Sequence, residues 1–304
     1  MDDTQEKPVW LVLLLVIIGA CVGVLIGSAI GAGVASLIYA GSGNFAQAMI
    51  NPTDENLRIP LLIVQGITTV FGFLIVPYLV WDALRKKGIS YFIGASFPFT
   101  SLLLIFVIVI AFAVADSAII EWNQNIRFPE FFKSFEEWAR AKEDQLAGLT
   151  KMITNFQSPL EFVIALVVVA IFAAVCEEFL FRGVIQTELF RGTKNIHVAI
   201  WVSAFLFSAI HAQFFGFVPR LLLGALFGYL YYWSGNLVIP MFAHFVNNGF
   251  ALTAIYLYQR KVVTTNLDSP ESAPWPAVII SAGVVGVILF YYKRKFQSTN
   301  PSVT

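Results

Sequence analysis

Long runs of apolar residues, separated by short polar connections, fill most of the chain. A helix needs about 20 mostly apolar residues to cross the hydrocarbon core of a bilayer. The pattern therefore predicts an all-α polytopic membrane protein with about eight transmembrane helices. The first apolar run is overlong and rich in glycine, so it is either a tilted helix or one that ends in a re-entrant turn. The predicted helices cover residues 9–40, 59–84, 99–120, 159–190, 196–213, 217–233, 236–257 and 276–292.

One long polar stretch, residues 121–158, interrupts the apolar runs. Its charges have both signs, and its apolar residues recur at about helical spacing. We expect an amphipathic helix around 126–150 on the extracytoplasmic side, and two interpretations are open. The helix either lies on the outer membrane surface or forms an ordinary cap over the bundle. Its apolar positions are Phe131, Phe132, Phe135, Trp138, Leu146 and Leu149.

The composition agrees with a membrane protein. Hydrophobic residues make up 58% of the chain and charged residues only 12%, whereas a soluble domain carries about 25% charged residues. The formal net charge of zero gives no indication of a nucleic-acid partner. Cys21 and Cys176 both lie in apolar runs and indicate no disulfide framework. The first apolar run is too long for a signal peptide, so we expect it to be retained.

Positive residues in short connections predict the orientation, because such residues concentrate on the cytoplasmic side. With eight spans, most of them fall on one side, and both termini are then cytoplasmic. Arg260 and Lys261 fall on the opposite side. We expect an integral protein of a bacterial cytoplasmic (inner or plasma) membrane. The positive sites on the cytoplasmic side are residues 85–88, Arg191 with Lys194, and residues 293–295.

Ionisable residues occur inside three of the predicted spans, where each costs at least about 2.5–3.5 kcal/mol on insertion scales. Glu178 and Arg182 are four residues apart, so they share a helical face and can pair. Glu177 is turned by about 100° from Glu178 and has no partner on its own helix. A single such group is usually a hydrogen-bonding contact between helices. Groups on three helices, at similar estimated depth, favour a functional site; the others are His211, His244 and Asn248.

These residue types support hydrolysis of an acyl bond in two ways. Glu177, His211 and His244 can bind a metal, with zinc as the candidate, and leave a position open for water. Alternatively, Glu177 acts as general base on water with the help of His211. His244 and Asn248 can then donate hydrogen bonds to the oxyanion. In both cases we expect the Glu178–Arg182 pair to hold the site in place, and His197 to be incidental.

Three motifs in the second half resemble those of a known family. The sequence "EEFLFRG" matches E-E-x-x-x-R, "FSAIH" matches F-x-x-x-H through Phe207 and His211, and "HFVNN" matches H-x-x-x-N. Over residues 159–256 the chain is similar to the CPBP (CAAX protease and bacteriocin-processing, or Abi) intramembrane proteases, relatives of the type II CAAX prenyl endopeptidase. The resemblance implies an intramembrane endopeptidase whose partners are the bilayer and a membrane-embedded or lipidated substrate. It assigns the catalytic roles to Glu177, His211, His244 and Asn248, and leaves a metallo- or glutamate-type mechanism open.

Two other classes of function remain as alternatives. Buried carboxylate and imidazole groups also serve as ion or proton relays in transporters. A non-catalytic immunity or scaffold protein could retain the same fold, although every motif residue is present here. We expect four parts: helices 1–3 at residues 1–120, the extracytoplasmic segment at 121–158, the catalytic core at 159–257, and the last helix with its cytoplasmic tail at 258–304.

Overall fold

The computed structural model describes residues 6–41, 44–49, 54–94, 96–264 and 272–299, and no β-strand occurs among them. Short connections join the helices, and two long helices contain segments with the wider π-helical hydrogen bonding. The α-helices are α1 (Val9–Ile38), α2 (Phe45–Ala48), α3 (Arg58–Val70), α4 (Val76–Arg85), α5 (Phe99–Gln124), α6 (Lys133–Thr154), α7 (Pro159–Ala165), α8 (Ala173–Glu178), α9 (Thr187–Thr193), α10 (Ile196–Ala209), α11 (Phe217–Ser234), α12 (Val238–Gln259) and α13 (Trp275–Thr299). The π-helical segments are η2 (Phe71–Ile75), η5 (Leu166–Phe172) and η6 (Phe179–Gln186).

All eight predicted spans are helical, and the expectation of an all-α membrane protein is confirmed. Within the described residues, six helical segments are long and apolar enough to cross a membrane. The other two predicted spans are α10, which has 14 residues, and α11, which has 18. α10 is shorter than the predicted span because it ends at Ala209, before His211, whereas α11 agrees with its predicted span to within one residue. The six spanning segments are Val9–Ile38, Glu55–Arg85, Phe99–Gln124, Pro159–Thr193, Val238–Gln259 and Trp275–Lys295.

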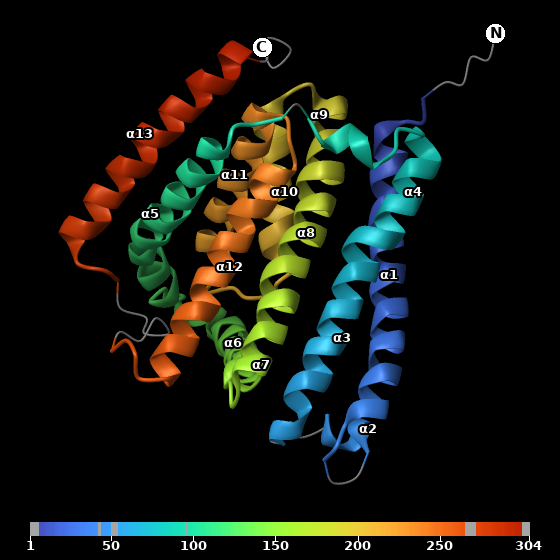
Figure 1. Cartoon of the computed structure of the whole chain (residues 1–304), viewed down its shortest axis with the longest axis vertical. Helices are drawn as coiled ribbons and strands as arrows, with labels where there is room; N and C mark the ends of the chain where they lie inside the picture. The colour runs from blue at the N-terminus through green and yellow to red at the C-terminus, as the bar shows by residue number, and fades with distance from the viewer. Residues whose placement is uncertain (1–5, 42–43, 50–53, 95, 265–271, 300–304) are drawn as a thin grey trace.

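The first helix is continuous over its 30 residues, so the described part of the chain contains no re-entrant turn there. α1 lies alongside α3 and α4 at one side of the molecule (Figure 1). A row of glycines spaced by four residues faces this neighbour. A Cβ atom on Gly23 would lie only 2.4 Å from the carbonyl oxygen of Phe71. Small residues therefore allow the two backbones to touch, as is common between membrane helices.

The helix that carries the first motif runs through the middle of the bundle. It is one continuous span from Pro159 to Thr193, built from α7, η5, α8, η6 and α9. α10, α11 and α12 pack against one side of it, α3 and α4 lie on the other, and α5 and α13 form the far edge (Figure 1). Phe179 and Phe181 of η6 are buried in the largest core cluster. The motif is therefore placed in the best-packed part of the molecule.

The predicted amphipathic helix is present but begins later than expected. α6 starts at Lys133, after a short 3-10 turn, and not near residue 126. Pro129 prevents an earlier start because proline cannot continue a preceding helical turn. α6 lies across the end of the bundle opposite to the start of α1 (Figure 1). Aromatic side chains of this segment are exposed, with Phe131 of the preceding 3-10 turn at 79% and Trp138 of α6 at 61%.

Candidate active site

Glu178 and Arg182 form the predicted ion pair. Arg182 Nη1 lies 2.8 Å from Glu178 Oε1, and both side chains are fully buried. Arg182 Nη2 also donates to the carbonyl oxygen of Gly224, at 2.8 Å. The guanidinium carbon lies 4.5 Å from the centre of the Phe207 ring and 5.5 Å from that of Phe227. The pair is thus fixed between η6, α10 and α11, which explains how two charges are tolerated in the interior.

His244 joins this pair from α12. Its Nδ1 lies 2.9 Å from Glu178 Oε1, and its Nε2 lies 3.1 Å from Asn248 Nδ2. Asn248 Nδ2 also lies 3.0 Å from the carbonyl oxygen of Val169, which identifies it as the amide nitrogen. Since an amide nitrogen only donates, Nε2 must accept, and the proton is on Nδ1. His244 therefore donates to Glu178, and its ring stacks on Phe227 at 5.3 Å between centroids.

Glu177 is placed differently from its neighbour in the sequence. Within the described residues, its carboxylate makes no hydrogen bond, and its nearest charged or polar partner is His244. The distance from Glu177 Oε2 to His244 Nε2 is 4.0 Å, too long for a direct hydrogen bond. The side chain is 12% exposed. The oxygens of Glu177 are therefore free to accept from a water molecule or a substrate.

His211 lies just beyond the end of α10. Its Nδ1 is 2.8 Å from the carbonyl oxygen of Phe207, so Nδ1 donates and Nε2 keeps a free lone pair. The Phe207 ring contacts both imidazoles, with centroid distances of 5.2 Å to His211 and 5.9 Å to His244. Phe207 thus connects the second motif to the other two. The structure brings Glu177, His244 and Asn248 into direct proximity, and it adds His211 through this ring.

A family model described as "Type II CAAX prenyl endopeptidase Rce1-like" matches residues 159–250. The matched segment contains the three motifs with Glu177, His211, His244 and Asn248. The chain is therefore similar to the CPBP family over this segment. The resemblance of the motifs is confirmed by the whole segment that positions them. The similarity supports a membrane protease in general, and it leaves the catalytic type open.

Individual relatives support the same assignment of a membrane protease. The chain is 33% identical to the "Membrane-embedded CAAX protease MroQ" of Staphylococcus aureus over 28% of its own length and 36% of that protein. It is 26% identical to the "Putative membrane peptidase YdiL" of Bacillus subtilis over 68% of its own length and 78% of that protein. It is 32% identical to an uncharacterized B. subtilis protein, YpbD, over 41% of its own length and 65% of that protein. The chain thus spans less than two thirds of YpbD and of MroQ, and no solved structure matches it.

The glycines of α11 also contribute to the candidate active site. The carbonyl oxygen of Gly228 accepts from Gln186 Nε2 at 3.1 Å, one turn beyond the Arg182–Gly224 hydrogen bond. A Cβ atom on Gly228 would lie 2.8 Å from Gln186 Oε1 and 2.9 Å from Ile200 Cγ2. These glycines permit close helix packing. They also expose backbone carbonyls to the polar side chains of η6.

The predicted zinc ligands do not form a ligand set in this arrangement. No group of three or more His, Cys, Asp or Glu side chains in the described ranges could hold a metal ion. Nδ1 of His244 donates to Glu178, and its Nε2 accepts from Asn248, so neither nitrogen has a lone pair available. A metal would require His244 to exchange a partner. The described arrangement of His244 therefore does not fit a bound metal.

Several polar residues were missed from the sequence. Arg220 and Asp116 lie inside predicted spans, and an ionisable residue at such a position is itself a sign of function. Asp116 is buried in α5, and its Oδ1 has no hydrogen-bond partner within the described residues. No pattern in the sequence indicates a role for Asn123 and Glu143, because both form hydrogen bonds with residues far away in the chain. His197 is exposed and bonds to Tyr229, consistent with its expected incidental role.

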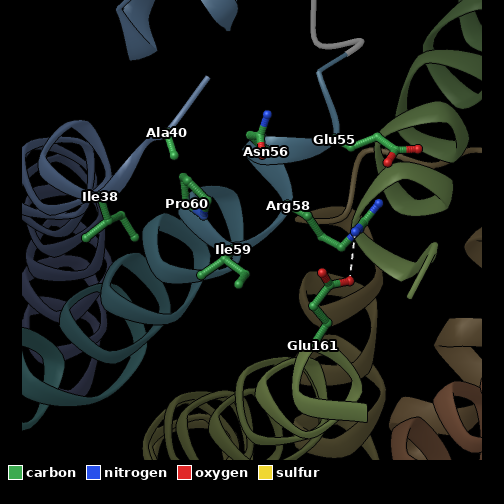
Figure 2. A pocket seen from close by; sticks show the side chains of 8 residues that line it. All are labelled: Ile38, Ala40, Glu55, Asn56, Arg58, Ile59, Pro60 and Glu161. Atoms are coloured by element: carbon green, nitrogen blue, oxygen red, sulfur yellow. Dashed lines mark hydrogen bonds and ion pairs between the residues drawn. The ribbon is translucent and has the colours of Figure 1, made fainter. Parts of the chain in front are cut away.

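A separate cavity of about 410 Å³ lies near the outer ends of α1, α3 and α7. In Figure 2, the buried Arg58 side chain points to Glu161, with Nη1 and Oε2 2.7 Å apart. Glu161 precedes Glu177 by sixteen residues on the same helix, which corresponds to about 24 Å. The cavity is therefore distinct from the candidate active site. It is lined by Ile38, Ala40, Glu55, Asn56, Arg58, Ile59, Pro60 and Glu161.

Proposed function

We propose that the protein is an intramembrane endopeptidase that cleaves membrane-embedded or lipidated proteins or peptides. The observation that carries this proposal is the contrast between two adjacent carboxylates. Oε1 of Glu178 accepts from both Arg182 and His244, whereas Glu177 makes no hydrogen bond within the described residues. A carboxylate in the membrane interior that makes no hydrogen bond is expensive and indicates a functional role. The similarity of residues 159–250 to a CAAX prenyl endopeptidase family supports peptide hydrolysis as the reaction.

In the proposed mechanism, Glu177 is the general base. A water molecule donates one hydrogen bond to Glu177 and the other to Nε2 of His211, whose Nδ1 is held by the Phe207 carbonyl. Glu177 takes the proton as the water oxygen attacks the peptide carbonyl carbon. The tetrahedral intermediate then collapses, and Glu177 returns the proton to the leaving amine. His211 orients the water. The products are a carboxylic acid and an amine, and Glu177 is again deprotonated.

We propose that His244 and Asn248 stabilise the oxyanion, which requires that Asn248 turns away from His244 and that Nε2 of His244 takes up a proton so that it can donate. Both N–H groups of Asn248 are engaged, one with Val169 and one with Nε2 of His244. The second of these must turn toward the substrate oxygen, which fits the tightening of catalytic hydrogen bonds on substrate binding. The Glu178–Arg182 pair then keeps His244 in place. Loss of one oxyanion donor typically lowers kcat by about 10²–10³.

We further propose that both termini face the cytoplasm of a bacterial cell. The positive connections after α4, after α9 and at the end of α13 lie at the same end of the molecule, opposite to α6 (Figure 1). This common end supports a cytoplasmic location, because positive residues are retained there. Cysteine labelling of Lys87→Cys and Glu137→Cys in intact cells tests the orientation. We expect an impermeant reagent to label only position 137.

The test of the activity uses purified protein in detergent with a library of peptides, each made with and without a lipidated cysteine. Cleavage is followed by mass spectrometry for the wild type, His211→Ala and Glu137→Gln. Glu137 is exposed on α6 and serves as the matched control. We expect wild type and Glu137→Gln to cleave at equal rates, and His211→Ala to lose about 10²-fold. Equal cleavage by His211→Ala would refute the assignment of this residue, and absence of any wild-type cleavage would count against the enzyme.

A further inference from the structure

The loop that carries His211, residues 210–216, is held by side chains from three other elements. From α5, Asn123 Oδ1 accepts from the backbone N–H of Val218 at 2.9 Å, and its Nδ2 donates to the carbonyl oxygen of Phe214 at 3.4 Å. Ala212, next to His211, has a φ of 53°, which is unfavourable for a residue with a side chain. Such a conformation persists only where the surroundings impose it.

The extramembrane helix α6 supplies the second contact. Glu143 Oε2 accepts from the backbone N–H of Phe215 at 2.9 Å. The guanidinium of Arg140 lies 4.1 Å from the centre of the Phe215 ring, which is buried. Phe135 also contacts Phe214, with 5.4 Å between ring centroids. Four residues after His211, the loop is thus bound to α6 by a hydrogen bond, a cation–π contact and an aromatic pair.

Arg220 of α11 supplies the third contact. Its Nη2 donates to Gln213 Oε1 at 2.6 Å, only two residues from His211. A Cβ atom on Gly216 would lie 3.5 and 3.6 Å from the Arg220 guanidinium nitrogens and 3.8 Å from Glu143 Oε1. Arg220 and Glu143 therefore meet on the same turn of the loop. A methyl group at position 216 would thus lie in ordinary van der Waals contact with both side chains.

We propose that Glu143 and Arg220 are positioning residues that hold His211 in its catalytic orientation, which makes α6 part of the catalytic apparatus. This inference rests on the proposed function. His211 itself has one side-chain hydrogen bond, to Phe207, so its ring position depends on the path of the loop backbone. A misplacement of about 1 Å can cost as much as 10²-fold in rate. The contacts with α6 and α11 hold the loop backbone after His211, at Phe215 and Gln213.

The test compares Glu143→Ala with Glu143→Gln, with Glu137→Ala as the control on the same helix. For each, kcat, KM and the unfolding temperature are measured on a peptide that the wild type cleaves. We expect Glu143→Ala to lower kcat about tenfold with KM nearly unchanged. Glu143→Gln keeps an oxygen that accepts from Phe215 and should recover most of the rate. Wild-type kcat in Glu143→Ala, or equal losses in both Glu143 variants, would overturn the proposal.

Arg220 gives a second, independent arm. Arg220→Lys keeps one donor for Gln213, whereas Arg220→Met removes it, so we expect the lysine variant to retain more of kcat. Equal activity of the methionine variant and the wild type would contradict the role of Arg220. Failure here is distinguishable from failure of the proposed function. If the wild type cleaves and His211→Ala does not, the enzyme assignment stands whatever the Glu143 and Arg220 variants show.

Discussion

Two groups of buried charge lie on the same long helix, eleven residues apart, and they are satisfied to different degrees. In the first, both oxygens of Glu188 are used: Trp81 Nε1 donates to Oε1 at 3.0 Å, Arg85 Nε donates to Oε1 at 2.9 Å, and Arg85 Nη2 donates to Oε2. Arg85 Nη1 donates to the carbonyl oxygen of Lys7 at 2.9 Å. This Glu188 group joins α4, α9 and the segment before α1 as a closed set.

The second group contains Glu177, Glu178, Arg182 and His244, and it is incomplete. Glu178 Oε2 and Arg182 Nε are buried without hydrogen-bond partners within the described residues. The carboxylate of Glu177 also lacks a hydrogen bond there. A buried charge pair contributes stability only when its remaining donors and acceptors are satisfied. The Glu188 group meets this condition, whereas the Glu177 group keeps capacity for a water molecule and a substrate.

The comparison shows that buried charge alone does not identify an active site in a membrane helix. What distinguishes the Glu177 group is unmet hydrogen-bonding capacity beside two imidazoles. Perturbed and unsatisfied groups concentrate at functional sites, because catalysis needs groups that can still react. The two groups should therefore respond differently to substitution.

Glu178→Gln should impair both stability and activity. It removes the countercharge of the fully buried Arg182 and the charged acceptor for His244. Breaking a buried pair in this way costs about 3–5 kcal/mol. Thermal unfolding in detergent and peptide cleavage, measured on the same sample, check the prediction. Unaltered unfolding together with wild-type cleavage would show that the pair does not support the site.

Glu188→Gln should lower stability by a similar amount and leave cleavage per folded molecule unchanged. The substitution leaves Arg85 buried without a countercharge, since its side chain is 2% exposed. The unfolding temperature gives the first effect. Cleavage, normalised to the folded fraction measured by size-exclusion chromatography, gives the second. A specific loss of kcat would remove the distinction between the two groups.

Gly228→Ala should destabilise the contact between α10, α11 and η6 by about 1–3 kcal/mol through overpacking. The new methyl group would meet Gln186 Oε1 and Ile200 Cγ2. Gly283→Ala is the matched control, because nothing lies within 4 Å of a Cβ atom at that position. Unfolding temperatures of the two variants are compared in the same detergent. Equal values would show that the close approach at Gly228 is not required.

Acid should loosen the start of α6 only well below neutral pH. The Phe128 N–H, with Arg140 and Arg127, holds the pKa of Glu136 at about 2, below its ordinary 4.5. Because the folded pKa is the lower one, the stabilisation is complete above about pH 4.5 and is lost as pH falls toward 2. Hydrogen exchange of residues 126–140 should rise in this window relative to Glu136→Gln at the same pH. An identical profile in that variant would contradict the role of Glu136.

Much of this arrangement could be predicted from local spacing. The helices followed from the apolar runs, and the Glu178–Arg182 pair followed from the four-residue period of a helix. The partner of His244 could not be predicted, because the rotation of α12 about its own axis decides whether it meets Glu177 or Glu178. The interactions of Asn123, Glu143 and Arg220 with the His211 loop were missed for a related reason. They join residues far apart in sequence, and the apolar pattern carries no information on such contacts.

The central claim is that Glu177 is the reactive carboxylate and Glu178 its support. The most direct measurement is the cleavage rate of Glu177→Gln, together with its unfolding temperature, against wild type and the exposed control Glu137→Gln. Because Glu177 makes no hydrogen bond within the described residues, we expect unfolding to be unchanged, while the rate falls by about 10²–10⁴ with the loss of the general base. Cleavage by Glu177→Gln at the wild-type rate would contradict the account.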